Sequence, residues 1–207
     1  MKSQQLKFGI LMAVIAMLLG AWLAHLVTGM RNAPPALQTG TVITPPRDVP
    51  AFTLQDTHGK PVTLMSLANH WSILFFGYTS CPDVCPTTLS QLAAAHKLLA
   101  DLPAQQQPQI IFISVDPRRD TIAKLAGYLN YFSKDFLGFT GTQEQINAFT
   151  SAMGVPVGYE TQPDGSYTVD HAATLFAINP QQQLVAVFSP PYQAAALAKD
   201  LRILVTH

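Results

Sequence analysis

The chain has 207 residues, and its 12 Lys and Arg balance its 12 Asp and Glu, so the formal net charge is zero. No basic block occurs anywhere, which removes the electrostatic basis for binding nucleic acid. The only two cysteines, Cys81 and Cys85, are too few for a secreted disulfide scaffold. Two cysteines separated by three residues, with none elsewhere, instead indicate one local site for redox or metal chemistry.

Residues 8–27 form an apolar stretch that is interrupted only by His25. A helix of that length rises about 30 Å, which matches the hydrocarbon core of a bilayer. The apolar regions of signal peptides are shorter, about 7–15 residues, and the best alternative is a signal peptide cleaved after Gly29. We therefore predict a cytoplasmic tip and an uncleaved transmembrane anchor over residues 1–30.

The charges around the predicted anchor indicate its orientation. Lys2 and Lys7 precede the apolar stretch, which favours an N-terminus on the cytoplasmic side. The few residues before the stretch leave no room for an organellar transit peptide. These features predict a single-pass protein of a bacterial inner membrane with its C-terminal domain in the periplasm.

Five prolines within residues 31–50 predict an extended linker, followed by one domain over residues 51–207. The elements expected in this domain are, in chain order, a hairpin over 52–64, a buried strand over 71–79, a helix over 88–102, a buried strand over 109–116, a helix over 121–132, a short strand over 137–140, a helix over 143–153, a hairpin over 158–169, strands within 170–180 and 184–190, and a helix over 193–204.

Buried strands that alternate with helices predict βαβ units around a parallel sheet. The order of strand, cysteine loop, helix, strand, helix, hairpin and helix is thioredoxin-like. We therefore predict an α/β protein with a thioredoxin-like fold and an N-terminal hairpin extension, preceded by one transmembrane helix. Functional sites in such sheets lie beyond the carboxyl ends of the strands, where Cys81 and Cys85 fall.

The two cysteines lie at the predicted N-terminus of a helix. Pro86 disfavours the α conformation at Cys85 and suits the first helical position, so we expect the helix to begin at Pro86. The helix dipole and the free amides there favour thiolates, which attack disulfides or bind metals. Redox thioredoxins have two residues between their cysteines, and the three present here leave a wider loop for two sulfurs around a soft ion such as Cu(I).

His171 is the best-placed histidine to complete a site with the cysteines. It stands just before the predicted strand AATLFAI, in the loop that faces the cysteine loop of a thioredoxin-like chain. Redox thioredoxins carry a cis-proline in that loop, and this sequence has no proline between Pro163 and Pro180. His96 would lie about 16 Å along the helix from Cys85, too far to share a metal.

Several interpretations stay open on the residues alone. The cysteines could form a plain structural disulfide, although so short a loop would gain little stability from it. Asp116 either supports the site or starts an ordinary Asp-Pro turn. We expect Arg118 and Arg119 to lie in a solvated loop, and Asp120 to cap the helix that follows.

Four stretches of the chain resemble the Sco/SenC family of copper proteins. They are FFGYTSCPDVCPTTL, ISVDPRRDT, GFTG and VDHAATLFAINP, and the resemblance spans about residues 50–205. The combination of C-P-D-V-C-P, D-P-x-R-D-T and V-D-H in this order is highly specific. The resemblance implies that Cys81, Cys85 and His171 bind copper, and we expect the histidine nitrogen to let the site hold Cu(II) as well as Cu(I).

The resemblance also implies a role at the dinuclear copper centre of cytochrome c oxidase, either copper delivery or thiol maintenance. The expected partners are the copper-bearing subunit of the oxidase and a periplasmic thiol reductase or copper donor. A metallochaperone, which is not an enzyme, is the first hypothesis. The second is a membrane-tethered thiol–disulfide reductase for the cysteines of the oxidase copper site. The third is a peroxidase-like redox sensor, for which the sequence offers no further residues.

Overall fold

The computed structural model describes residues 9, 12–13, 15–23 and 35–206. The chain divides into two compact units, Met1–Pro34 and Pro35–His207. The described residues of the first unit are helical. Within the described parts of the chain, no helix combines the length and the apolar character needed to cross a bilayer. The anchor predicted over residues 1–30 falls largely outside the described residues.

An eight-stranded mixed sheet forms the centre of the second unit, in the order β1-β10-β9-β4-β5-β6-β2-β3. Its middle strands β4 (Ser72–Gly77), β5 (Gln109–Ser114) and β6 (Leu137–Thr140) run parallel. β4 is buried at every position, and β5 at every position but its first. Such continuous burial is typical of parallel strands, because helices cover both faces of their sheet.

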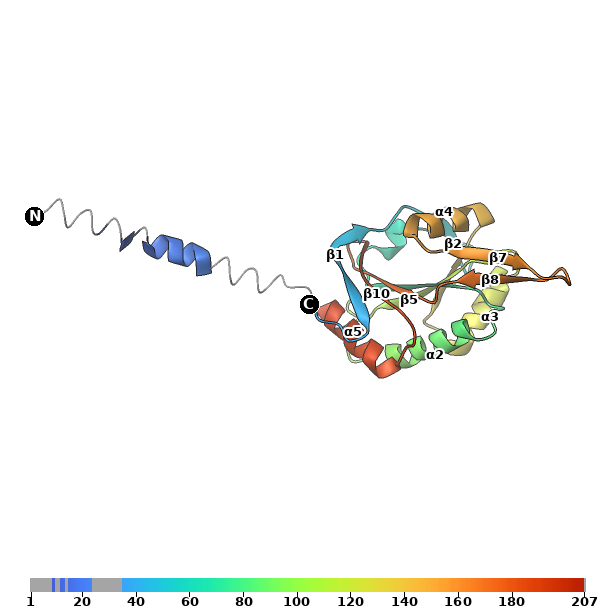
Figure 1. Ribbon diagram of the computed structural model, residues 1–207. Helices are drawn as coiled ribbons and strands as arrows, with labels where there is room; N and C mark the ends of the chain where they lie inside the picture. The colour runs from blue at the N-terminus through green and yellow to red at the C-terminus, as the bar shows by residue number, and fades with distance from the viewer. Residues whose placement is uncertain (1–8, 10–11, 14, 24–34, 207) are drawn as a thin grey trace, which may run out of the picture. The chain divides into compact units, whose positions relative to one another are not determined.

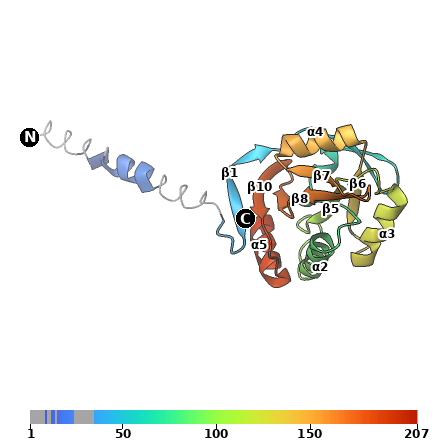
Figure 2. The same ribbon diagram turned by 45° about the vertical axis from the view of Figure 1, so that its right-hand side comes forward.

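The helices of the second unit lie on both faces of the sheet. Figure 1 shows α4 (Gln143–Met153) on one face and α2 (Val84–Lys97) and α5 (Ala194–Thr206) on the other, where these two pack together. α3 (Ile122–Phe132) lies beside α2 and contacts β6 (Figure 2). These layers and the strand order confirm the prediction of a mixed α/β, thioredoxin-like domain.

Antiparallel strands extend the sheet at both sides. β9 (Leu175–Ile178) pairs with β4, and β10 (Gln183–Phe188) pairs with β9. On the other side, β2 (Thr53–Asp56) and β3 (Pro61–Thr63) form the predicted N-terminal hairpin, followed by a short 3₁₀ helix, η1 (Leu64–Leu67). Gly59 takes a φ of 75° in the hairpin turn, a conformation that glycine adopts without steric cost.

Part of the predicted linker belongs to the folded unit. β1 (Gly40–Asp48) pairs antiparallel with β10, and its register shifts between Val42 and Arg47. The interval contains Pro45 and Pro46, which lack an N–H donor and are tolerated at sheet edges and bulges. The structure therefore differs from the prediction of a linker over 31–50. The prolines indicate extended backbone, but its pairing depends on a strand far along the chain.

A separate two-stranded sheet follows α4. It consists of β7 (Val157–Thr161) and β8 (Tyr167–His171), which form the predicted hairpin. Only Val169 is buried among the residues of these two strands. Figure 1 shows the hairpin as a narrow ribbon that extends beyond the neighbouring strands. The last residue of β8 is His171, so this lightly buried ribbon carries a predicted ligand.

Candidate metal centre

The cysteine loop connects the carboxyl end of β4 to the first turn of α2. The helix begins at Val84, with Asp83 at the N-cap, two residues before the predicted start at Pro86. Proline fits at this third helical position because the first-turn amides have no partner within the helix. Cys85 therefore lies inside the first turn, and its amide donates a hydrogen bond to Cys81 Sγ at 3.5 Å.

Gly77, the last residue of β4, allows the Cys85 sulfur to lie against the strand. A β-carbon at position 77 would be 2.9 Å from Cys85 Sγ and 2.8 Å from the Phe112 ring. Both distances are shorter than any normal contact, so a larger residue would displace the sulfur or the ring. Cys85 is fully buried, and its sulfur is thus held by close packing.

The imidazole of His171 is oriented by the backbone of the next residue. Its Nδ1 lies 3.2 Å from the Ala172 carbonyl oxygen, which can only accept, so Nδ1 carries the proton of this hydrogen bond. This leaves Nε2 as the nitrogen with a free lone pair, and it lies 3.3 Å from Cys85 Sγ. The Tyr78 ring packs edge-to-face with the imidazole at 5.6 Å.

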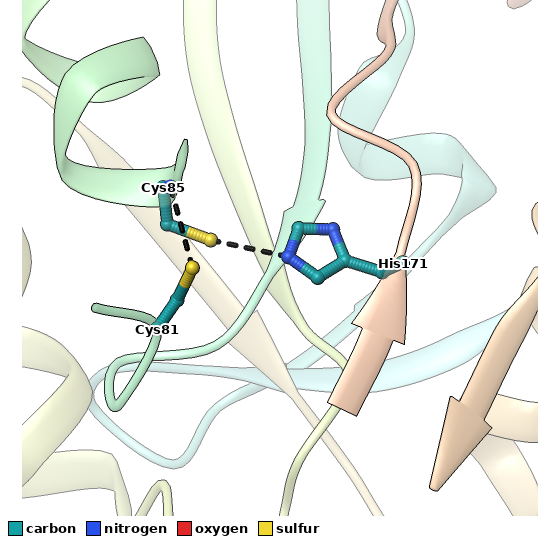
Figure 3. A group of neighbouring side chains, drawn as sticks. All are labelled: Cys81, Cys85 and His171. Atoms are coloured by element: carbon teal, nitrogen blue, oxygen red, sulfur yellow. Dashed lines mark hydrogen bonds between the residues drawn. The ribbon is translucent and has the colours of Figure 1, made fainter. Parts of the chain in front are cut away.

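The structure brings the three predicted site residues together. Figure 3 shows the two sulfurs and Nε2 of His171 pointing toward a common point. Their ligand atoms all lie within 4.8 Å of one another. Thiolate and imidazole together suit copper, whereas a structural zinc site needs four protein ligands. The donor set and its spacing therefore fit one copper ion.

The site opens to the surface on one side. The groove at its mouth is lined by Tyr78, Cys81, Pro82, Asp83, Val84, Val169, Asp170 and His171. The groove therefore contains one cysteine and the histidine, while Cys85 forms the buried floor. A partner that brings its own ligands could reach the metal position from this side.

The two thiols differ in acidity. A hydrogen bond from the Cys85 side chain lowers the pKa of Cys81 well below the ordinary thiol value, against the opposing effect of burial. The same hydrogen bond and the burial of Cys85 raise the pKa of the Cys85 thiol. Cys81 is thus the thiolate of the pair, and Cys85 gives up its proton when a cation enters.

The other predicted positions have ordinary environments. His58 is exposed in the β2–β3 turn, His70 is exposed before β4, and His96 packs against the Phe136 ring. His207 lies outside the described residues. The two free thiols show no disulfide between the cysteines.

The loop between β5 and α3 differs from its prediction. The cap of α3 is Thr121 and not Asp120, which is buried and accepts hydrogen bonds from the Thr79 amide and hydroxyl. Arg118 is exposed as expected, but Arg119 is only partly exposed: it pairs with buried Asp116 and stacks on Tyr167. The signal in the sequence was a cluster of charged residues directly after a buried strand, and the two aspartates of this cluster are buried because that strand lies in the centre of the sheet.

Comparison with known proteins identifies the family. The SCO1/SenC family model matches residues 42–206. A protein of Stutzerimonas stutzeri that is named for copper binding is 37% identical over 175 residues, which cover 83% of each chain. The mitochondrial SCO1 homolog 1 of Arabidopsis thaliana is 34% identical over 70% of this chain. This chain covers only 43% of that plant protein.

Solved structures agree with the sequence comparison. Copper-bound ScoI of Bradyrhizobium japonicum is 34% identical, with a TM-score of 0.68 over 75% of this chain and 98% of its own. Apo Sco1 of Thermus thermophilus is also 34% identical, with a TM-score of 0.71 over 85% of this chain and all of its own. The similarity includes the cysteine loop, the β7–β8 hairpin and the sheet between them, since the family match runs from β1 to α5. The chain therefore belongs to the SCO1/SenC family.

Proposed function

We propose that this protein is a metallochaperone that binds copper through Cys81, Cys85 and His171 and delivers it to the dinuclear copper centre of cytochrome c oxidase. The observation that carries the proposal is the convergence of two sulfurs and one imidazole nitrogen within 4.8 Å at the floor of an open groove. Relatives with bound copper support the choice of metal.

Each ligand has a separate part in this proposal. The two sulfurs suit Cu(I), which favours soft thiolates. The imidazole adds a nitrogen donor that also suits Cu(II), and its Nδ1 hydrogen bond to Ala172 keeps Nε2 available. Three protein ligands leave room for a fourth from the receiving protein, so copper can move by exchange of one ligand at a time.

Copper analysis of the purified, reduced full-length protein tests the proposal. We expect one copper per chain, and the single variants Cys81→Ser and Cys85→Ser should each lose it. His96→Ala is the matched control, because this histidine lies on α2 beside the Phe136 ring and outside the site. Copper that survives either cysteine substitution unchanged would refute the ligand set.

Transfer needs its own measurement. The loaded protein is mixed with the soluble copper-bearing domain of the oxidase, and copper is followed by the visible spectrum of the dinuclear centre. We expect copper transfer only from a protein in which both cysteines bind the copper. A loaded protein that keeps its copper in the presence of this acceptor would contradict the delivery role.

A thiol–disulfide reductase is the second candidate, and the acidity of Cys81 favours it. The groove is lined by a low-pKa thiolate that lies next to a second thiol, the arrangement that reduces a partner's disulfide. In that reaction the Cys81 thiolate and the Cys85 thiol form a disulfide and lose two electrons and one proton, and the disulfide of the oxidase subunit is reduced to two thiols with this proton and one from water. Metal-free protein that reduces this subunit while forming a Cys81–Cys85 disulfide would support the reductase.

We further propose that residues 1–30 anchor the protein in a bacterial inner membrane, and that the folded unit, which begins at Pro35, lies in the periplasm. The apolar stretch 8–27 supports this arrangement. Extraction of membranes at alkaline pH should leave the full-length protein in the pellet. A soluble protein with a new N-terminus near Arg31 would show a cleaved signal peptide instead.

A further inference from the structure

The loop between β5 and α3 contains two buried aspartates that contact two different segments of the site. Asp116 is 0% and Asp120 1% exposed, although only three residues separate them. Buried carboxylates are costly unless they are paired and hydrogen-bonded, so their partners are informative. The partners of Asp120 lie in the cysteine loop, and those of Asp116 lie in the β7–β8 hairpin.

Asp120 holds the turn that leads to Cys81. Its carboxylate accepts hydrogen bonds from the Thr79 amide at 2.9 Å and from the Thr79 hydroxyl at 2.5 Å. It also accepts one from the Ser114 hydroxyl at the end of β5, at 2.7 Å. The Lys124 ammonium lies 3.7 Å away and supplies the opposite charge. Thr79 is two residues before Cys81, so this carboxylate fixes the backbone from which the first sulfur projects.

Asp116 holds the strand that ends at His171. Its carboxylate accepts a hydrogen bond from the Tyr167 hydroxyl at 2.6 Å and forms an ion pair with Arg119. The Arg119 guanidinium in turn donates to the Tyr167 carbonyl oxygen at 2.9 Å and lies 4.0 Å from the centre of the Tyr167 ring. Tyr167 and His171 lie four residues apart on one strand and therefore on the same face of it.

The Arg119 guanidinium also contacts Tyr78, the residue that follows β4 and precedes the cysteine loop. It lies 5.5 Å from the centre of the Tyr78 ring, and this ring packs edge-to-face against the His171 imidazole. Arg119 thus lies between two aromatic rings, one on the histidine strand and one at the start of the cysteine loop. Because the hairpin buries only Val169, its position depends on polar contacts of this kind more than on a core of its own.

From these contacts we propose that the β5–α3 loop positions the copper ligands relative to one another, with Arg119 and Asp116 acting on His171, and Asp120 acting on Cys81. This inference rests on the proposed copper site. It assigns positioning residues and adds no ligand. Each end of the loop acts on one donor type, so weakening the Arg119 end should affect Cu(II) binding more than Cu(I) binding, whereas weakening the Asp120 end should affect both.

The test compares Arg119→Lys and Thr79→Val in the full-length protein, with Arg118→Lys as the matched control. Lysine keeps the charge of Arg119 but loses its flat, forked hydrogen-bonding group. Valine keeps the shape of Thr79 but removes one hydrogen bond to Asp120. Arg118 is an exposed neighbour in the same loop, and it makes no hydrogen bond or ion pair with any residue that the structure describes.

We expect Arg119→Lys to weaken Cu(II) binding about 10-fold and to shift the Cu(II) absorption bands, because the imidazole is displaced, while Cu(I) affinity changes by less than about 3-fold. Thr79→Val should weaken binding of both ions by similar factors, because it displaces a sulfur. Arg118→Lys should leave both affinities and the spectrum unchanged. Competition with chelators gives the affinities, and the thermal midpoint of each metal-free variant gives its stability.

Two outcomes would overturn the proposal. One is that Arg119→Lys and Thr79→Val lower both affinities alike, in proportion to their loss of thermal stability, which is the pattern of a purely structural loop. The other is unchanged copper binding in both variants. Should Arg119→Lys fail to fold, Tyr167→Phe removes only the hydroxyl that donates to Asp116 and carries the same expectation for Cu(II). A wild-type protein that binds no copper would refute the proposed function itself, whereas the two outcomes above refute only the role of the loop.

Discussion

The two segments that carry the candidate ligands are built very differently. The cysteine loop connects β4, which is buried at every position, to the first turn of α2. His171 ends a hairpin that pairs with no other strand of the described chain and buries a single residue. The cysteines therefore follow the buried centre of the sheet, with Cys85 fully buried, and the imidazole ends a lightly buried ribbon.

This difference divides the site into a fixed part and an adjustable part. Segments with few buried contacts open locally at a lower free energy than the core does. The sulfurs that suit Cu(I) are held in place before a metal arrives, whereas the histidine that Cu(II) requires depends on the contacts of a surface ribbon. We infer that changes at the cysteine loop affect all copper binding, and that changes at the hairpin affect mainly Cu(II).

Oxidation of the cysteine pair should produce the largest effect. A disulfide sulfur carries no thiolate charge, so joining Cys81 to Cys85 removes two ligands at once. We expect the oxidised full-length protein to bind no copper and the reduced protein to bind one ion, as measured by metal analysis after gel filtration. Free-thiol titration before copper is added provides the control. Stoichiometric, tight binding by the oxidised protein would mean that the cysteines are not the ligands.

Removal of the imidazole should separate the two oxidation states of copper. His171→Ala leaves both sulfurs in place, so we expect Cu(II) affinity to fall about 100-fold or more and Cu(I) affinity to fall less than about 10-fold. Chelator competition under anaerobic and aerobic conditions measures the two values. His70→Ala, an exposed histidine before β4, is the control. Equal retention of both ions, with an unchanged Cu(II) spectrum, would remove His171 from the site.

A larger residue at Gly77, the end of β4, tests how firmly close packing holds the Cys85 sulfur. Gly77→Ala places a β-carbon 2.9 Å from Cys85 Sγ, so we expect a loss of roughly 1–3 kcal/mol in the free energy of unfolding. The affinities for Cu(I) and Cu(II) should fall together, because the displaced group is a sulfur. Gly127→Ala, where nothing lies within 4 Å of the new carbon, is the matched control. A loss confined to Cu(II) would contradict the division between fixed sulfurs and adjustable imidazole.

Much of the site could be predicted because its signals are local. The pattern C-P-D-V-C-P places both sulfurs at the N-terminus of one helix, and the position of His171 before a buried strand places it opposite them. The start of α2 was predicted two residues late, since a proline suits any position in the first turn and not only the first. Local rules of this kind fix which residues meet, but leave the element boundaries uncertain by a residue or two.

The supporting contacts could not be predicted, because they depend on residues far apart in the sequence. Asp116 meets Tyr167 across 51 residues, and Asp120 meets Thr79 across 41. Read locally, an aspartate before proline suggests a turn and an aspartate before threonine suggests a helix cap. The same limit explains β1, whose partner β10 lies at the other end of the chain and whose prolines indicate only extended backbone.

The smallest effect on copper is expected where the fold is weakened far from both ligand segments. Asp200, on α5, is fully buried and accepts hydrogen bonds from the amides of Gln38, Thr39 and Gly40. These bonds hold the chain at its entry to β1, an edge strand three strands away from β4. We therefore expect Asp200→Asn to cost about 2 kcal/mol of stability, since an amide nitrogen then faces these donors, with copper affinities unchanged.

The pH dependence of this loss provides its sharpest check. Burial alone would raise the pKa of Asp200, but the hydrogen bonds from Gln38, Thr39 and Gly40 lower it below the usual aspartate value. A carboxyl whose folded pKa is lowered stabilises the protein above its unfolded pKa of about 3.9, and this contribution disappears as pH falls through the folded value. The difference in unfolding free energy between wild type and Asp200→Asn should thus be full at pH 7 and shrink below about pH 4. A pH-independent loss in Asp200→Asn would show that packing, and not the charge, holds β1 to α5.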